Sequence, residues 1–339
     1  MGKLPAVHLG SSGVETTTLG FGCADLFREP ASAQRRRLLD AAFDHGIRHF
    51  DVAPMYGLGQ AEPALGAFAR GKRDRLVIAT KFGIEPTAAG RLIGRVQAPL
   101  HRGVRRLRGA SGRARTGDGD PRSGLVGGAL YASGMYTAAV ARRSLERSLR
   151  HLRTDHVDLL FLHDPEPGAH IGDDLAAYLD SARDAGYIRA WGIAGERVPA
   201  AMAAEHMNAP VPLFQVRGDL LSRLLLPMGV SPSSAAIVYG VIGRVLPRLH
   251  EFIHSDPKLQ EQWSSATGVD CGDAGSLAAL LLREALLANA GGTVLFSTTS
   301  PARVECACAI ARNPAAAGAA IERFRSLVAA VLPEVLAQP

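Results

Sequence analysis

The sequence predicts an α/β fold, a parallel (β/α)8 barrel with long loops on the face where its strands end. Short apolar runs alternate with longer amphipathic segments through most of the 339 residues, which is the rhythm of alternating strands and helices. Strands buried on both faces should read as almost continuous apolar residues, and VDLLFL at 157–162 does so. No GxGxxG follows an expected strand at the head of a helix, so a Rossmann domain has no support.

Eight strands, six helices and a helical C-terminal segment follow from this alternation, and we expect one domain over 1–339. The expected strands are 18–22, 47–52, 76–80, 157–162, 188–193, 212–216, 236–241 and 293–296. The expected helices are 32–45, 60–70, 137–152, 173–185, 197–207 and 275–289, with one or two more over 301–332 outside the barrel.

Two long insertions interrupt the alternation. Residues 84–135 are rich in Gly and Arg, and 217–235 with 243–274 lack a helix–strand rhythm. Long loops after barrel strands line the substrate entrance, so we expect these segments to set specificity.

The net charge of +6 is concentrated in one segment, 91–122, which holds nine arginines against two aspartates. Because that segment alone carries +7, the rest of the chain is close to neutral, which argues against a nucleic-acid partner. We interpret 91–122 as a solvated, mobile surface loop, with an anion-attracting lid over the active site as the alternative. It follows the strand that carries Lys81, so its root should lie beside the site.

Nothing in the chain predicts export, membrane insertion or metal binding. No basic N-terminal stretch leads into an uninterrupted apolar one, and the apolar region 277–296 is broken by Arg283, Glu284 and Asn289. We therefore expect a cytoplasmic protein. Its cysteines pair with no histidine in a metal-ligand pattern and should be reduced thiols: Cys23, Cys271, Cys306 and Cys308.

Four polar residues follow or end expected strands: Asp51, Tyr56, Lys81 and His163. The carboxyl ends of barrel strands converge on the face that carries the chemistry. A tyrosine has a reference pKa near ~10, which a neighbouring ammonium lowers, while a carboxylate fixes the amine. A histidine can hold a carbonyl oxygen within reach of the phenol. Each residue alone has a structural alternative, such as a loop cap or a core imidazole, but the four together predict proton transfer to an alkoxide left by hydride addition.

Several motifs that span most of the chain resemble those of the aldo-keto reductases. They are LGFGCADL (19–26), GIRHFDVAPMYGLGQAEPALG (46–66), VIATKFG (77–83) and SLERSLRHLRTDHVDLLFLHDPEP (144–167). FDVAPMYGLGQAE is most similar to the sugar and aldose dehydrogenases of that family. The resemblance implies a TIM barrel and a nicotinamide cofactor bound without a Rossmann domain, usually NADP(H), with NAD(H) as the alternative.

The resemblance also implies contacts to the nicotinamide end of the cofactor. Gln215 matches the glutamine that hydrogen-bonds the carboxamide, and Tyr239 matches the aromatic residue that stacks on the nicotinamide ring. Gly22 and Cys23 fall in the first-strand motif that contributes to the same site. Ala194 and Gly195 stand where the family commonly has Ser and Asn to grip the carboxamide, a loss of about 1 kcal/mol per hydrogen bond.

At the other end of the cofactor, LFSTTSPARVECA (295–307) resembles the family's phosphate clamp. Hydroxyl and backbone donors at a helix start suit a phosphate, and an ordinary helix cap is the alternative. The implied residues are Ser297, Thr298, Thr299, Ser300 and Arg303, the last for a 2′-phosphate. Cys306 and Ala307 replace the pair that usually holds the adenine, which predicts weaker or less selective nucleotide binding.

The sequence therefore predicts an NADP(H)-dependent oxidoreductase that interconverts a carbonyl and an alcohol, acting on a small carbonyl or sugar-like substrate as a monomer or small homo-oligomer. A second interpretation is an NAD(P)+-dependent aldose dehydrogenase that oxidises a lactol to a lactone. A third, from another class, is a non-catalytic nucleotide-binding subunit that senses redox state; the intact set of four polar residues argues against it.

Overall fold

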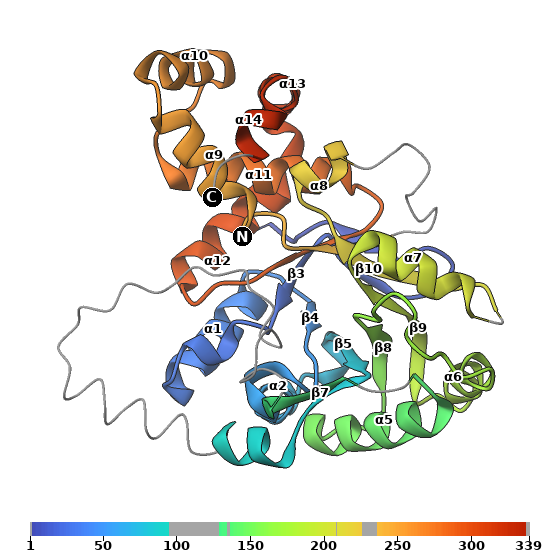
Figure 1. Ribbon diagram of the computed structural model, residues 1–339. Helices are drawn as coiled ribbons and strands as arrows, with labels where there is room; N and C mark the ends of the chain where they lie inside the picture. Colours follow the sequence, from blue (N-terminus) through green and yellow to red (C-terminus); the bar gives the residue numbers. More distant parts are fainter. Residues whose placement is uncertain (1, 95–128, 134–135, 208, 226–235, 337–339) are drawn as a thin grey trace.

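Eight parallel strands close into a barrel in the computed structural model, which describes residues 2–94, 129–133, 136–207, 209–225 and 236–336 (Figure 1). β12 pairs with β3 and closes the sheet. All eight strands lie at the predicted positions, which confirms the fold class. They are β3 (Leu19–Gly22), β4 (His49–Asp51), β5 (Val77–Phe82), β8 (Val157–His163), β9 (Ile188–Gly195), β10 (Leu213–Arg217), β11 (Ala236–Tyr239) and β12 (Thr293–Phe296).

The six predicted helices are present and pack outside the barrel (Figure 1). α5 illustrates why they form: Thr137 accepts a hydrogen bond from the backbone N–H of Val140 at its start, and Ala141, Leu145 and Leu152 are buried along one face. The six are α1 (Ser32–Asp44), α2 (Ala61–Ala69), α5 (Ala138–Leu152), α6 (Leu175–Asp184), α7 (Arg197–Glu205) and α11 (Ala274–Ala288).

A short antiparallel hairpin, β1 (Ala6–His8) and β2 (Glu15–Thr17), was not predicted. Leu9 and Val14 at its turn are fully buried and belong to the same apolar cluster as Val77, at the start of β5. The hairpin therefore covers the end of the barrel at which the strands begin, which leaves the other end for a site.

Residues 243–274 form two helices, so the expectation of an irregular loop at the substrate entrance is wrong there. α10 (Pro257–Thr267) begins at Asp256, whose carboxylate accepts from the Lys258 N–H, and ends at Gly268 with φ +74°. The remaining helices of this region are α8 (Leu220–Leu225), α9 (Val245–His254), α12 (Pro301–Arg312), α13 (Gly318–Ala330) and α14 (Leu332–Leu336).

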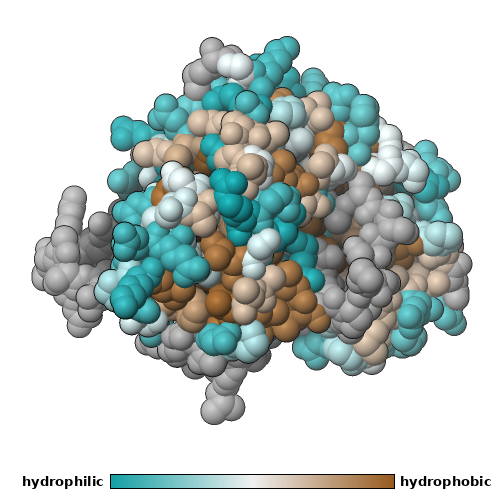
Figure 2. Space-filling view, turned by 90° about the horizontal axis from the view of Figure 1, so that it is seen from above, coloured by the Kyte–Doolittle hydropathy of each residue, from teal (hydrophilic) through white to brown (hydrophobic). Residues whose placement is uncertain are grey.

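Most of these helices form a lobe beside the barrel with an apolar core of its own (Figure 1). Trp263 of α10 packs edge-on against Phe324 of α13, and Leu249 and Leu281 are buried in the same cluster. Hydrophilic and hydrophobic residues are interspersed over this side of the molecule (Figure 2). Within the described ranges, no helix is long and apolar enough to span a membrane.

The root of the long basic insertion lies beside the Tyr56 loop, as predicted. The strands β6 (Ile84–Pro86) and β7 (Tyr131–Ser133) pair at the base of the insertion. Ile84 clusters with Met55, and Tyr56 and Tyr131 pack against the same cluster. Of the segment 91–122, residues 95–122 lie outside the described residues.

Candidate active site

The structure brings the four predicted catalytic residues together at the carboxyl ends of three adjacent strands. Asp51 ends β4, Lys81 lies near the end of β5, and His163 ends β8. Tyr56 lies at the first turn after β4. The rings of Tyr56 and His163 meet edge-on, with centroids 5.9 Å apart and planes at 85°.

A buried ion pair forms the base of the site. The Lys81 ammonium donates to both carboxylate oxygens of Asp51 at 2.7 Å and to the Val52 carbonyl at 3.2 Å. Only 2% of the Lys81 side chain and 3% of the Asp51 side chain are exposed. Burial raises the pKa of the Asp51 carboxyl, since desolvation outweighs Lys81 and a hydrogen bond from Gln215, which lower it.

The expected lowering of the Tyr56 pKa is wrong for this site. The Lys81 ammonium lies 5.2 Å from the centre of the Tyr56 ring, but its charge is compensated by the Asp51 carboxylate. Burial raises the pKa of the Tyr56 phenol well above its usual value of 10.0, and the Asp51 charge raises it further. The phenol is therefore protonated at neutral pH and can donate a proton.

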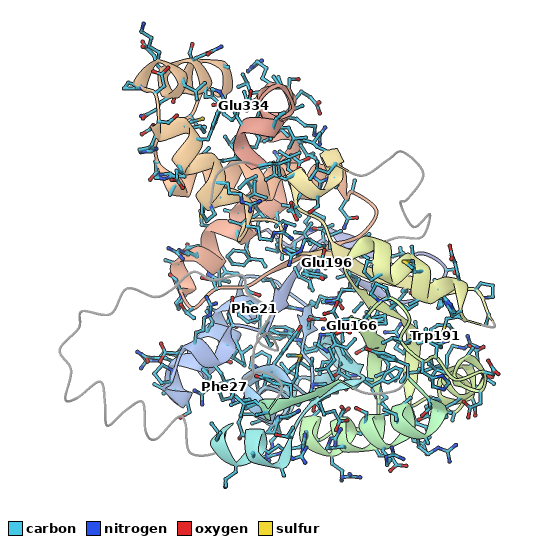
Figure 3. All side chains as sticks on the ribbon, viewed as in Figure 1. Phe21, Phe27, Glu166, Trp191, Glu196 and Glu334 are labelled. Atoms are coloured by element: carbon cyan, nitrogen blue, oxygen red, sulfur yellow. The ribbon has the colours of Figure 1, made fainter. Side chains whose placement is uncertain are left out.

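The turn that carries Tyr56 depends on a glycine. Gly57 has φ +58°, and a Cβ at this position would lie 2.6 Å from the ring of Phe27, the residue marked in Figure 3. Leu58 follows with φ +53°, so two consecutive left-handed residues turn the chain immediately after Tyr56. Any larger residue at position 57 would displace Phe27 or the tyrosine.

Gln215 has the arrangement expected of a cofactor ligand. It is 2% exposed, and its side chain hydrogen-bonds the Asp51 carboxylate. Its Oε1 atom has no hydrogen-bond partner among the residues that the structure describes. An unsatisfied buried acceptor costs about 1–3 kcal/mol, and a carboxamide N–H of a bound nicotinamide would satisfy it. The residues present therefore fit the predicted cofactor.

Tyr239 lies at the end of β11, partly exposed, with the Arg217 guanidinium 5.4 Å from its ring centre. Arg217 also donates to Glu196 at 2.7 Å, and Figure 3 marks Glu196 just after β9. The sequence reasoning missed this ion pair, although both residues lie within two positions of a residue it examined. The pair places a charged group of each sign at the rim of the site.

Gly22 and Ser297 are engaged with each other where the barrel closes. The Ser297 hydroxyl donates to the Gly22 carbonyl at 3.0 Å, and a Cβ at Gly22 would lie 2.5 Å from that hydroxyl. Cys23 donates its N–H to the Asp51 carbonyl at 2.8 Å. Its thiol is fully buried, and burial raises its pKa far above the usual range. A nucleotide contact by these residues stays a prediction.

The predicted phosphate clamp opens α12. Ser300 caps the helix and accepts from the Arg303 N–H at 3.5 Å, while Thr298 accepts from the Ser300 N–H at 3.1 Å. Thr298 is buried, whereas the side chains of Thr299 and Arg303 are exposed. These residues therefore do form the ordinary helix cap that was the alternative to a phosphate clamp, and Arg303 remains accessible beside that cap.

The departure at positions 194–195 has a structural reason. A Cβ at Gly195 would lie 3.2 Å from Asp164 Oδ1 and 3.3 Å from its Cα. Asparagine at this position would therefore require Asp164 to move. In the described part of the chain, no group of three or more His, Cys, Asp or Glu side chains is arranged to hold a metal ion.

The model of the Aldo/keto reductase family matches residues 18–112 and 124–265, so the chain belongs to this family. A D-threo-aldose 1-dehydrogenase from a Pseudomonas species is 34% identical over 257 residues, which are 73% of this chain and 71% of the relative. A 6-dehydroglucose reductase from Novosphingobium aromaticivorans is 28% identical over 198 residues, 55% of this chain and 50% of that protein.

Solved structures share the fold at low sequence identity. An aldo-keto reductase from Bacillus halodurans, in its holo form, has a TM-score of 0.64 at 19% identity and covers 96% of each chain. One from Klebsiella pneumoniae, in complex with NADPH, has a TM-score of 0.60 at 21% identity, covering 100% of this chain and 97% of its own. Family membership confirms the predicted resemblance and the enzyme class, an NAD(P)H-dependent oxidoreductase.

Proposed function

We propose that this chain reduces a carbonyl to an alcohol with NADP(H), and that Tyr56 donates the proton. One observation carries the proposal: the partly buried phenol of Tyr56 stands edge-on to His163 and beside the Lys81–Asp51 pair. The substrate is a small carbonyl or sugar-like molecule.

The roles of the side chains follow from their contacts. When bound, the cofactor supplies a hydride to the carbonyl carbon. The substrate oxygen then gains a proton from the Tyr56 hydroxyl, while His163 holds that oxygen in place. Lys81 and Asp51 hold each other in a fixed position, with the ammonium 5.2 Å from the centre of the Tyr56 ring. Gln215 would accept a hydrogen bond from the carboxamide through its Oε1, which has no partner among the described residues.

The catalytic side chains do not set the direction of reaction, because microscopic reversibility assigns the same groups to reduction and to oxidation. The similarity to a D-threo-aldose 1-dehydrogenase supports a second candidate, oxidation of an aldose lactol to a lactone. A non-catalytic sensor would not need four assembled catalytic groups.

Cofactor choice and cellular setting complete the proposal. The exposed Arg303 at the start of α12 supports a preference for a 2′-phosphate, hence for NADP(H) over NAD(H). Ser297, Thr298, Thr299 and Ser300 would line the same end of the cofactor. All four cysteines are free thiols, which supports a cytoplasmic location. We propose one domain over 1–339, working as a monomer or small homo-oligomer without a nucleic-acid partner.

An absorbance assay tests the proposal. Purified protein is incubated with NADPH and a panel of aldehydes and ketones, and in parallel with NADP+ or NAD+ and a panel of aldoses. Consumption of NADPH by a carbonyl supports the leading function, whereas reduction of the oxidised cofactor by aldoses alone selects the dehydrogenase. Cofactor binding without turnover on either panel would refute both enzymatic functions.

A further inference from the structure

The strand β8, which ends at His163, extends one residue beyond its last pair with β5. The last pair between β5 and β8 joins Phe82 to Leu162, and the chain then leaves the sheet at Gly83, with φ +106°. On the other side, the Asp164 N–H donates to Ala194 of β9. The backbone N–H and C=O groups of successive residues point to alternate sides of a strand. Because the Asp164 N–H points toward β9, the His163 carbonyl faces the opposite side, where β5 has ended.

Tyr136 supplies the missing partner. Its hydroxyl donates to the His163 carbonyl at 2.7 Å, and the residue is only 3% exposed. A buried carbonyl without a partner would cost free energy comparable to a lost hydrogen bond. The Tyr136 hydroxyl therefore donates the hydrogen bond to the His163 carbonyl that a backbone N–H of a longer β5 would otherwise donate.

The ring of Tyr136 is held on several sides. It packs against Phe82, with centroids 6.2 Å apart, and a Cβ at Gly83 would lie 2.2 Å from its Cε1. Its backbone N–H donates to the His170 carbonyl at 3.0 Å, and its carbonyl accepts from the Gly172 N–H at 2.9 Å. Tyr136 thus connects the ends of β5 and β8 with the loop that follows the catalytic histidine.

We propose that Tyr136 is a positioning residue for His163, an inference that rests on the proposed function. The imidazole meets Tyr56 edge-on, and the next residue, Asp164, has the left-handed φ of +50° that non-glycine residues rarely adopt. The main chain of His163 is therefore fixed between a strained turn and the Tyr136 hydroxyl. Releasing it would move the imidazole relative to Tyr56 and loosen the hold on the carbonyl oxygen.

Tyr136→Phe tests the proposal, because it keeps the ring and removes the hydroxyl. Tyr178→Phe, which removes a hydroxyl from a partly buried tyrosine of α6, is the matched control. In Tyr136→Phe we expect kcat for carbonyl reduction to fall about 10-fold with NADPH affinity unchanged, as for a modest misplacement of a catalytic group. The 15N resonances of the His163 ring and their pH titration should shift, while the control matches the wild type in both.

Tyr56→Phe, measured in parallel, distinguishes a failure of the positioning role of Tyr136 from a failure of the proposed function. Wild-type kcat and unchanged His163 resonances in Tyr136→Phe, with Tyr56→Phe inactive, would overturn the positioning role and leave the proposed function standing. An active Tyr56→Phe would refute the proposed function, and the His163 resonances alone would then decide whether Tyr136 positions the ring. Should Tyr136→Phe not fold, Phe82→Leu loosens the same ring with the hydroxyl kept, and unchanged His163 resonances there would overturn the proposal.

Discussion

Removing the Lys81 amine should destabilise the protein more than a surface charge would. In Lys81→Met the Asp51 carboxylate stays almost completely buried, and of its side-chain partners in the described part of the chain Gln215 remains. Breaking a buried ion pair in this way costs about 3–5 kcal/mol.

Protonation of Asp51 limits that cost. A carboxyl with an unfolded-state pKa of 3.8 can be neutralised at pH 7 for about 4 kcal/mol, at about 1.4 kcal/mol per unit of pH. We therefore expect the free energy of unfolding to fall by about 3–4 kcal/mol at pH 7. The folded variant then binds a proton that the unfolded chain lacks, so its stability relative to the wild type should recover as the pH falls toward 4.

Urea unfolding of the wild type, Lys81→Met, Asp51→Asn and the double variant at pH 7 and pH 5 measures these terms. The double variant contains neither charge, so it should recover most of the stability that either single variant loses, while remaining catalytically inactive. If Lys81→Met lowers the free energy of unfolding by less than about 1 kcal/mol, or by an amount independent of pH, the Lys81–Asp51 pair is accessible to water and the prediction is refuted.

Three further predictions concern acid stability, cofactor choice and the basic segment. Burial lowers the pKa of His49 to about 3 from 6.5, so the unfolded chain takes up a proton first as the pH falls; urea unfolding should show about 2 kcal/mol lost from this site by pH 5, and a His49→Gln variant with the same pH dependence would contradict it. Arg303→Ala should weaken NADP(H) binding by about 1–3 kcal/mol in fluorescence titrations, with NAD(H) much less affected; equal losses would assign the arginine another role. Replacing 95–122 by a short Gly/Ser linker should preserve folding, lower substrate affinity and flatten the salt dependence of association; an unfolded product would place the segment in the core.

The barrel could be predicted from the sequence because its strands are buried on both faces. Such strands consist of almost continuous apolar residues, as in VDLLFL. The four catalytic residues could be found for the same reason, since each stands out against an apolar run. The helices α9 and α10 were missed although their signals are local: Val245, Leu249 and Ile253 are buried four positions apart along α9, and Asp256 and Gly268 cap α10.

Other features depend on contacts between distant segments. Tyr136 contacts the His163 carbonyl across 27 positions, and Arg217 contacts Glu196 across 21, so neither role could be read from local pattern. The pKa of Tyr56 was predicted wrongly for a related reason. The sequence places a carboxylate beside Lys81, but it does not show that desolvation and the Asp51 charge together outweigh the ammonium at the phenol.

The central claim, that Tyr56 is the proton donor of a nicotinamide-dependent reductase, is tested most directly by Tyr56→Phe. The measurement is steady-state turnover of NADPH with the best carbonyl substrate, alongside the affinity for NADPH from its fluorescence. We predict that turnover falls by about 10²-fold or more while cofactor affinity and the free energy of unfolding stay close to wild type. A variant that retains most of its wild-type turnover would contradict the account.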